Sequence, residues 1–112
     1  MHLDDQDATY LWDMLEACRD IADFTRDAEL EDFLGDRMLV LAVERSLEII
    51  GEAAGQISDG FRNDHQDVQW RNIRGIRNIL AHEYGQVNRE IVYNTVMNEI
   101  PVLRAKLEKL LP

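Results

Sequence analysis

Residues 36–58, DRMLVLAVERSLEIIGEAAGQIS, decide the fold of this 112-residue chain. Apolar side chains recur along this stretch every three or four residues, at Leu39, Val43, Leu47, Ile50, Ala54 and Ile57. This spacing is typical of an amphipathic helix that buries one face. Residues 38–43 are apolar at nearly every position, so we expect that end of the helix to be buried on more than one side.

Gly51 and Gly55 lie four residues apart within the same stretch. A glycine in a helix interior costs about 1 kcal/mol relative to alanine, so we expect a compensating close approach to this face. The sequence leaves two neighbours open, another helix of the same chain or a second copy of the chain.

Three further stretches have helical spacing of apolar residues, and they cover residues 4–26, 68–81 and 88–110. The polar stretch 59–67 predicts a loop that contains His65, with Asp67 as N-cap of the helix that follows. Pro101 is expected to kink or interrupt the last helix. Together these stretches predict an all-α fold, a small antiparallel bundle of four to five helices that forms a single domain over residues 1–112.

The composition excludes several classes of protein. Hydrophobic residues make up 46% and charged residues 30%, as in globular proteins, and aromatic residues are too few for a β-sandwich. No apolar run approaches the ~20 residues of a membrane span, and no signal-peptide pattern begins the chain. The single cysteine, Cys18, fits a reducing compartment. We therefore expect a cytoplasmic protein without membrane contact.

Metal and cofactor motifs are missing from the sequence. His2, His65 and His82 are widely spaced, and no Cys or His pair has the spacing of zinc ligands. The sequence contains neither a glycine-rich phosphate loop nor a Gly-x-Ser-x-Gly elbow. We expect no metal site and no cofactor.

The negative charge is concentrated in the first third of the chain. The net charge is -10, and residues 1–36 alone contain 12 acidic and two basic side chains. Part of this charge forms an acidic stripe on the first expected helix, at Asp13, Glu16, Asp20, Asp23 and Asp27. The stripe is either a solvated face or a contact for a basic partner. Residues 62–89 contain five arginines against three acidic residues, which is compatible with a local phosphate site.

The expected helix over residues 68–81 carries the candidate chemistry. At about 100° per residue, its apolar residues share one side, and the other side carries a polar row beside Gly75, formed by Arg71, Arg74, Asn78 and His82. Arginine binds phosphate oxygens in a bidentate manner, and histidine titrates near neutrality and transfers protons. This row is a candidate phosphate-binding surface, although a polar helix face with one histidine is more often simply solvated.

Arg77 and His82 do not project side by side, because they are roughly 140° apart on an ideal helix. A shared site then requires a break in the helix, a long arginine that reaches round, or a second copy of the chain. Of these we favour a two-fold dimer in which the polar faces of two such helices line one cleft.

The stretch RNILAHEY, from Arg77 to Tyr84, resembles the signature of HEPN-domain ribonuclease toxins of the HepT type. That signature is arginine, four residues, histidine, one residue and tyrosine. Residues 47–53, LEIIGEA, are similar to the family's pattern in its second helix, and Trp70 and residues 92–103 also fit. The resemblance covers most of residues 10–110. Glu83 stands where the family often has a small residue.

The resemblance implies a metal-independent endoribonuclease that acts as the toxin of a prokaryotic toxin–antitoxin pair, similar to types II and VII. It further implies a homodimer whose two motifs meet in a cleft. Carried over, His82 would be the acid/base for attack of the ribose 2′-hydroxyl on the adjacent phosphate, and Arg77 would hold that phosphate. Asn78 would orient the substrate or His82, and Arg74 of the polar row would bind or position the RNA substrate. Tyr84 would line the cleft.

The resemblance also implies an MNT-type nucleotidyltransferase as the antitoxin. In related systems that enzyme attaches AMP to the tyrosine that corresponds to Tyr84. A charged nucleotide there would repel and block RNA.

A second class of function fits the same residues, a non-catalytic helical subunit that binds nucleotides or docks a minimal nucleotidyltransferase. A ribonuclease loses RNA cleavage in His82→Ala, whereas a docking subunit keeps its partner and cuts no RNA in either form. The acidic stripe fits both functions.

Overall fold

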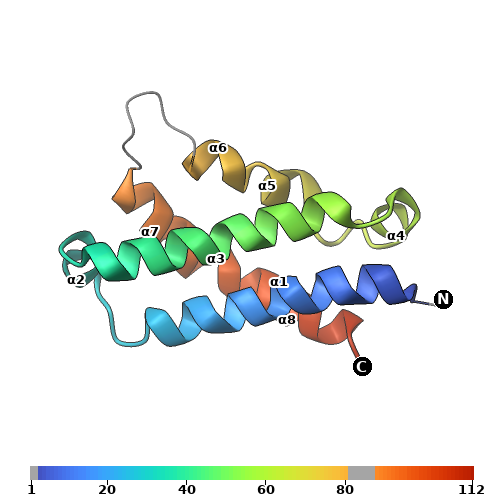
Figure 1. Ribbon diagram of the computed structural model, residues 1–112, viewed down its shortest axis with the longest axis horizontal. Coiled ribbons are helices and arrows are strands. Elements are labelled where there is room, and N and C mark those ends of the chain that lie inside the picture. Colours follow the sequence, from blue (N-terminus) through green and yellow to red (C-terminus); the bar gives the residue numbers. More distant parts are fainter. Residues whose placement is uncertain (1–2, 81–87) are drawn as a thin grey trace.

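The computed structural model describes residues 3–80 and 88–112, and these residues contain eight helices and no strand (Figure 1). Two helices are 20 residues long, α1 (Asp5–Phe24) and α3 (Arg37–Gln56). The shorter ones are α2 (Leu30–Leu34), α4 (Asp59–Asp64), α5 (Trp70–Arg74), α6 (Ile76–Leu80), α7 (Arg89–Asn98) and α8 (Ile100–Leu110). The predicted all-α bundle is confirmed.

The two long helices run antiparallel and form the centre of the molecule (Figure 1). Helix α8 packs on α1, and α5 and α6 pack on α3. Helix α7 contacts α2 and α8. At the start of α3, the side chain of Asp36 accepts a hydrogen bond from the backbone N–H of Leu39 at 3.1 Å. This N-cap satisfies one of the free N–H groups at the helix end.

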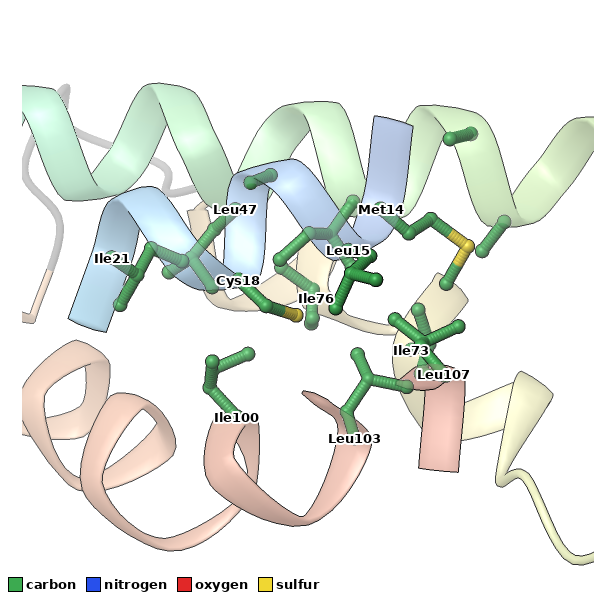
Figure 2. Packing of buried hydrophobic residues seen from close by; sticks show 14 of the residues in the cluster. Met14, Leu15, Cys18, Ile21, Leu47, Ile73, Ile76, Ile100, Leu103 and Leu107 are labelled. Carbon is green, nitrogen blue, oxygen red and sulfur yellow. The ribbon is translucent and has the colours of Figure 1, made fainter. Parts of the chain in front are cut away.

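Apolar side chains from all eight helices meet in one core. Figure 2 shows where they converge, with Met14, Leu15, Cys18 and Ile21 from α1, Leu47 from α3, Ile73 from α5, Ile76 from α6, and Ile100, Leu103 and Leu107 from α8. Burial of each leucine or isoleucine side chain stabilises the fold by roughly 1.5–3 kcal/mol. The apolar stripe predicted for α3 is buried from Val43 to Ile57, while Leu39 is only half-buried.

The expected burial of residues 38–43 on more than one side is wrong. Met38 is 81% exposed and Leu41 is 48% exposed. The reason is that α3 begins at one end of the bundle, where α1 and α2 cover one side of it. An apolar face therefore remains on the surface of α3.

Residues 59–67 are not a simple loop, because α4 occupies the first six of them. Ser58 caps α4, and its Oγ accepts the N–H of Phe61 at 3.2 Å. Ser58 is held in turn by the buried carboxylate of Asp7 in α1, which accepts the Ser58 N–H at 2.8 Å and the Ser58 hydroxyl at 2.6 Å. A bond between residues 51 positions apart lies beyond local sequence signals.

The helix predicted over residues 68–81 is divided into α5 and α6 at Gly75, and Gln69 rather than Asp67 is the N-cap of α5. The interruption expected at Pro101 is confirmed, since α7 ends at Asn98 and Pro101 lies in the first turn of α8. Proline is tolerated in a first turn because the N–H it lacks would have no partner there. Within the described ranges, no helix is long and apolar enough to cross a membrane.

Replacement of Asp7 by alanine should lower the free energy of unfolding by about 1–3 kcal/mol, because it leaves two donors of Ser58 without their acceptor in a half-buried place. The measurement is urea denaturation. Asp5→Ala is the matched control, since Asp5 is an exposed acid in the same first turn of α1. Equal losses in both variants would show that the link to Ser58 is not the cause.

The thiol of Cys18 should be unreactive in the folded protein. The pKa of this thiol is raised from 9.0 to about 12, mainly by burial, while Arg104 lowers it and Glu108 adds a smaller rise. Because the thiolate is the nucleophile, a disulfide reagent at pH 8 should label the native chain many times more slowly than the urea-unfolded chain. Fast labelling of the native protein would contradict this. The Cys18 thiol ionises at a lower pH in the unfolded chain than in the folded one, so its ionisation favours unfolding. The contribution of the neutral buried thiol to the free energy of unfolding is therefore fully present below about pH 9 and is lost as the pH rises towards 12.

Candidate active site

A polar groove of about 850 Å³ lies between the C-terminal half of α3 and the α5–α6 segment. Helix α3 contributes Gly51, Glu52, Gly55 and Gln56, and the α5–α6 segment contributes Trp70, Arg71, Arg74, Gly75 and Asn78. Figure 1 shows α5 and α6 running alongside this part of α3. The groove therefore brings two segments together that are about 20 positions apart in the sequence.

Two arginines dominate the electrostatics of the groove. Arg71 and Arg74 are three residues apart on α5 and both are exposed, so they project on neighbouring positions of one helix face. Neither forms an ion pair with any residue in the part of the chain that the structure describes. Two guanidinium groups without carboxylate partners attract an anion, and their planar forks match phosphate oxygens.

Trp70 fixes the start of α5 to the rest of the bundle. Its indole Nε1 donates a hydrogen bond to the carbonyl oxygen of His65 at 3.0 Å. Its ring meets the ring of Phe61 edge-on, with 6.2 Å between the centroids. Trp70 is buried, and these contacts fix both its indole N–H and its ring. The backbone at the start of α5, to which the two arginines are attached, is therefore held in a defined position.

Three glycines line the groove, and two of them, Gly75 and Gly55, are there for different structural reasons. At Gly75 a Cβ would lie 3.2 Å from the carbonyl oxygen of Asn72, so glycine permits the tight passage from α5 to α6. At Gly55 a Cβ would meet nothing within 4 Å among the described atoms, so that position is open space facing the groove. The close approach that we expected against the glycine pair is therefore not made at Gly55 by the described part of this chain.

The structure brings three of the predicted site residues together. Arg71 and Arg74 from α5 and Asn78 from α6 all line the groove. Arg77 lies in α6, but its side chain is outside the described part of the structure. His82 and Tyr84 lie outside the described residues altogether.

Sequence reasoning missed three lining residues, Glu52, Gln56 and Trp70. Glu52 lies between Gly51 and Gly55, and this glycine pair was the feature of the sequence that predicted a close approach to that part of α3. Nothing local showed that this face meets α5, because helix pairing is decided by the packing of the whole chain.

A second hollow of about 240 Å³ lies on the other side of α5, against α7 and α8. Its walls include Ile73, Ile76 and Leu103, and the ammonium group of Lys106 there donates to the carbonyl oxygen of Asp67. This hollow suits apolar groups better than phosphate. As for metals, no three His, Cys, Asp or Glu side chains within residues 3–80 and 88–112 are placed to hold an ion.

Comparison with protein families identifies the group to which these features belong. The profile of the family described as "Ribonuclease HepT-like" matches residues 14–110, which include the whole groove. The chain belongs to this family. Membership in the HepT-like family makes ribonuclease the class of enzyme to which the chain is assigned, and the resemblance given by the RNILAHEY stretch is thereby confirmed.

Curated relatives agree with the family over most of their length. "Probable ribonuclease HepT" of Thermococcus cleftensis is 43% identical over 90% of this chain and 92% of its own. Two proteins named "Putative RNase" are also similar. The one from Caldanaerobacter subterraneus is 39% identical over 91% of both chains, and the one from Methanocaldococcus jannaschii is 35% identical over 88% of this chain and 91% of its own. A comparison with solved structures gave no significant match.

Proposed function

We propose that this member of the HepT-like family is a metal-independent endoribonuclease whose substrate lies in the groove between α3 and α5–α6. The observation that carries the proposal is the pair of arginines in that groove, Arg71 and Arg74, which form no ion pair within residues 3–80 and 88–112, with the amide of Asn78 in the same lining. Two cations and an amide suit a phosphodiester and the polar edges of a nucleotide.

The proposed reaction needs no external nucleophile. The ribose 2′-oxygen attacks the adjacent phosphorus and the bond to the 5′-oxygen breaks, which leaves a 2′,3′-cyclic phosphate and a 5′-hydroxyl. In this scheme His82 transfers a proton, and Arg77 holds the phosphate and stabilises the charge that develops on it. Arg74 and Asn78 bind and orient the strand, and Tyr84 lines the cleft.

The proposed active form is a homodimer. Support comes from α3, on which Met38 and Leu41 are exposed at one end and Gly55 faces open space at the other. A second copy could cover the exposed apolar residues and bring two groove segments into one cleft. On an ideal helix Arg77 and His82 are roughly 140° apart, so a second copy is also a way to bring Arg77 of one chain to His82 of the other.

The proposed biological role is that of a toxin paired with an MNT-type nucleotidyltransferase as its antitoxin. AMP on Tyr84 would add negative charge and bulk to a cleft built for a polyanion, so it would exclude RNA by repulsion and by volume. This part of the proposal rests on the RNILAHEY stretch and on the family.

The direct test is cleavage of a mixed RNA pool by purified protein in excess chelator, beside His82→Ala and beside a 2′-deoxy strand of the same sequence. We expect the wild type to cut RNA to cyclic-phosphate ends, His82→Ala to be slower by about 10²-fold or more, and the 2′-deoxy strand to stay intact. The mass of each protein is recorded in the same experiment.

Three outcomes would contradict the proposal or redirect it. Equal cutting by both proteins would mean a contaminant and would remove His82 from the site. No cutting by protein of unmodified mass, with retained binding of a nucleotidyltransferase, would favour the docking-subunit alternative. No cutting by protein whose mass is raised by AMP units would mean that the silenced form had been purified, which supports the antitoxin part of the proposal.

The role of the arginine pair is tested by salt dependence. The Arg71→Gln/Arg74→Gln double variant should bind a single-stranded RNA more weakly, and the slope of log affinity against log salt should fall by about 1.4, since each phosphate contact contributes about 0.7. The matched control is Arg19→Gln/Arg26→Gln, with Arg19 in α1 and Arg26 just after its end, which removes the same charge away from the groove. A similar loss in both double variants would show that net charge, and not the groove, governs binding.

A further inference from the structure

We propose that Glu52 is a second catalytic residue of this groove, the base that takes the proton from the ribose 2′-hydroxyl of the RNA. The inference rests on the proposed ribonuclease function and deepens it. It divides the proton transfers of the reaction between two side chains, whereas the family signature supplies a single histidine.

The position of Glu52 is the first argument. It lines the groove from α3, while Arg71 and Arg74 line it from α5. Among the lining residues that the structure describes, Glu52 is the only one with a carboxylate. Since α3 is a 20-residue helix packed on α1 and on α5–α6, Glu52 is carried by a rigid element. A rigid support is what a proton-transfer group needs in order to meet a bound substrate repeatedly in one geometry.

The charge of Glu52 is the second argument. A carboxylate repels phosphate, so a groove that only bound RNA would bind it better without Glu52. An acidic group in such a place is explained when the substrate offers it a hydrogen-bond donor. In RNA the donor nearest to each phosphate is the adjacent 2′-hydroxyl, and a carboxylate that accepts its hydrogen bond is also placed to accept its proton.

The surroundings of Glu52 differ from those of its neighbour Glu48. Arg45 lies near both, with its Nη1 3.3 Å from an oxygen of Glu48 and 3.9 Å from an oxygen of Glu52. The shorter contact is a hydrogen bond and the longer one is not. Arg45 therefore holds Glu48 by a hydrogen bond and pairs with Glu52 only through the longer ion-pair contact. The Glu52 side chain is 63% exposed, so a ligand in the groove can reach it.

The proton balance of the step requires both an acid and a base. As the 2′-oxygen forms its bond to phosphorus, its proton passes to the Glu52 carboxylate. As the bond from phosphorus to the 5′-oxygen breaks, that oxygen takes a proton from His82. Glu52 ends protonated and His82 ends neutral, and each exchanges its proton with water before the next turnover.

A substrate whose leaving group needs no proton separates these two roles. Uridine 3′-(p-nitrophenyl phosphate) releases a stable phenolate, so it still requires the base but not the acid. We expect Glu52→Gln to lower kcat about 10²-fold or more on this substrate and on RNA alike. His82→Ala should be slowed mainly on RNA. Binding of a 2′-deoxy strand to Glu52→Gln should be unchanged or tighter, because a negative charge has been removed.

Glu48→Gln is the matched control. It lies one helical turn earlier, is exposed, and shares Arg45 with Glu52, but it does not line the groove. It should cleave both substrates at the wild-type rate. Circular dichroism of both variants checks that the helices are intact, as expected for glutamine at exposed helix positions.

Each remaining outcome would overturn the inference. If the wild type cleaves RNA and Glu52→Gln cleaves both substrates at the same rate as the wild type, Glu52 is not catalytic and the proposed ribonuclease function still stands. If Glu52→Gln is slow on RNA alone, Glu52 acts on the leaving group or on another nucleotide, and not as the base. If the wild type cleaves neither substrate, the proposed function fails and the inference fails with it.

Discussion

The antiparallel packing of α1 against α3 is the constraint on which the rest of this structure depends. Each of the two helices is long enough to offer a buried stripe along one side and to support a second layer, α8 on α1 and α5–α6 on α3. The bond from Asp7 to Ser58 closes the same pair at the far end of α3 and sets where α4 begins. Without this pair, none of the shorter helices has a surface to pack on, and helices of five or six residues are not stable alone.

The groove is a consequence of how the second layer meets α3. Trp70 is held in the core and begins α5, and α5 ends at Gly75 after five residues. The chain changes direction there, and both α5 and α6 remain packed on α3. On the opposite wall, formed by α3, Gly55 adds no side chain to the groove. A hollow lined by polar groups remains where a continuous pair of helices would have filled the space.

Charge is separated over the molecule in a way that suits a polyanionic ligand. The acidic stripe, four residues of α1 and Asp27 just beyond its end, is exposed throughout and contributes no residue to the groove, where Arg71 and Arg74 provide the local positive charge. Binding depends on the local potential and not on the net charge of -10. The surface of α1 should therefore repel a nucleic-acid strand, and the groove should attract it.

The sequence by itself determined the helical class, the long helix over residues 36–58, the break near Pro101 and the shared face of Arg71, Arg74 and Asn78, because these follow from local periodicity and backbone chemistry. The RNILAHEY stretch also indicated the family to which the chain belongs. Only the tertiary structure decided that Glu52 faces the arginines, that Ser58 starts a helix, and that the start of α3 stays exposed. Those features depend on which helix faces meet, and contacts between residues far apart in the chain leave no periodic trace in either partner.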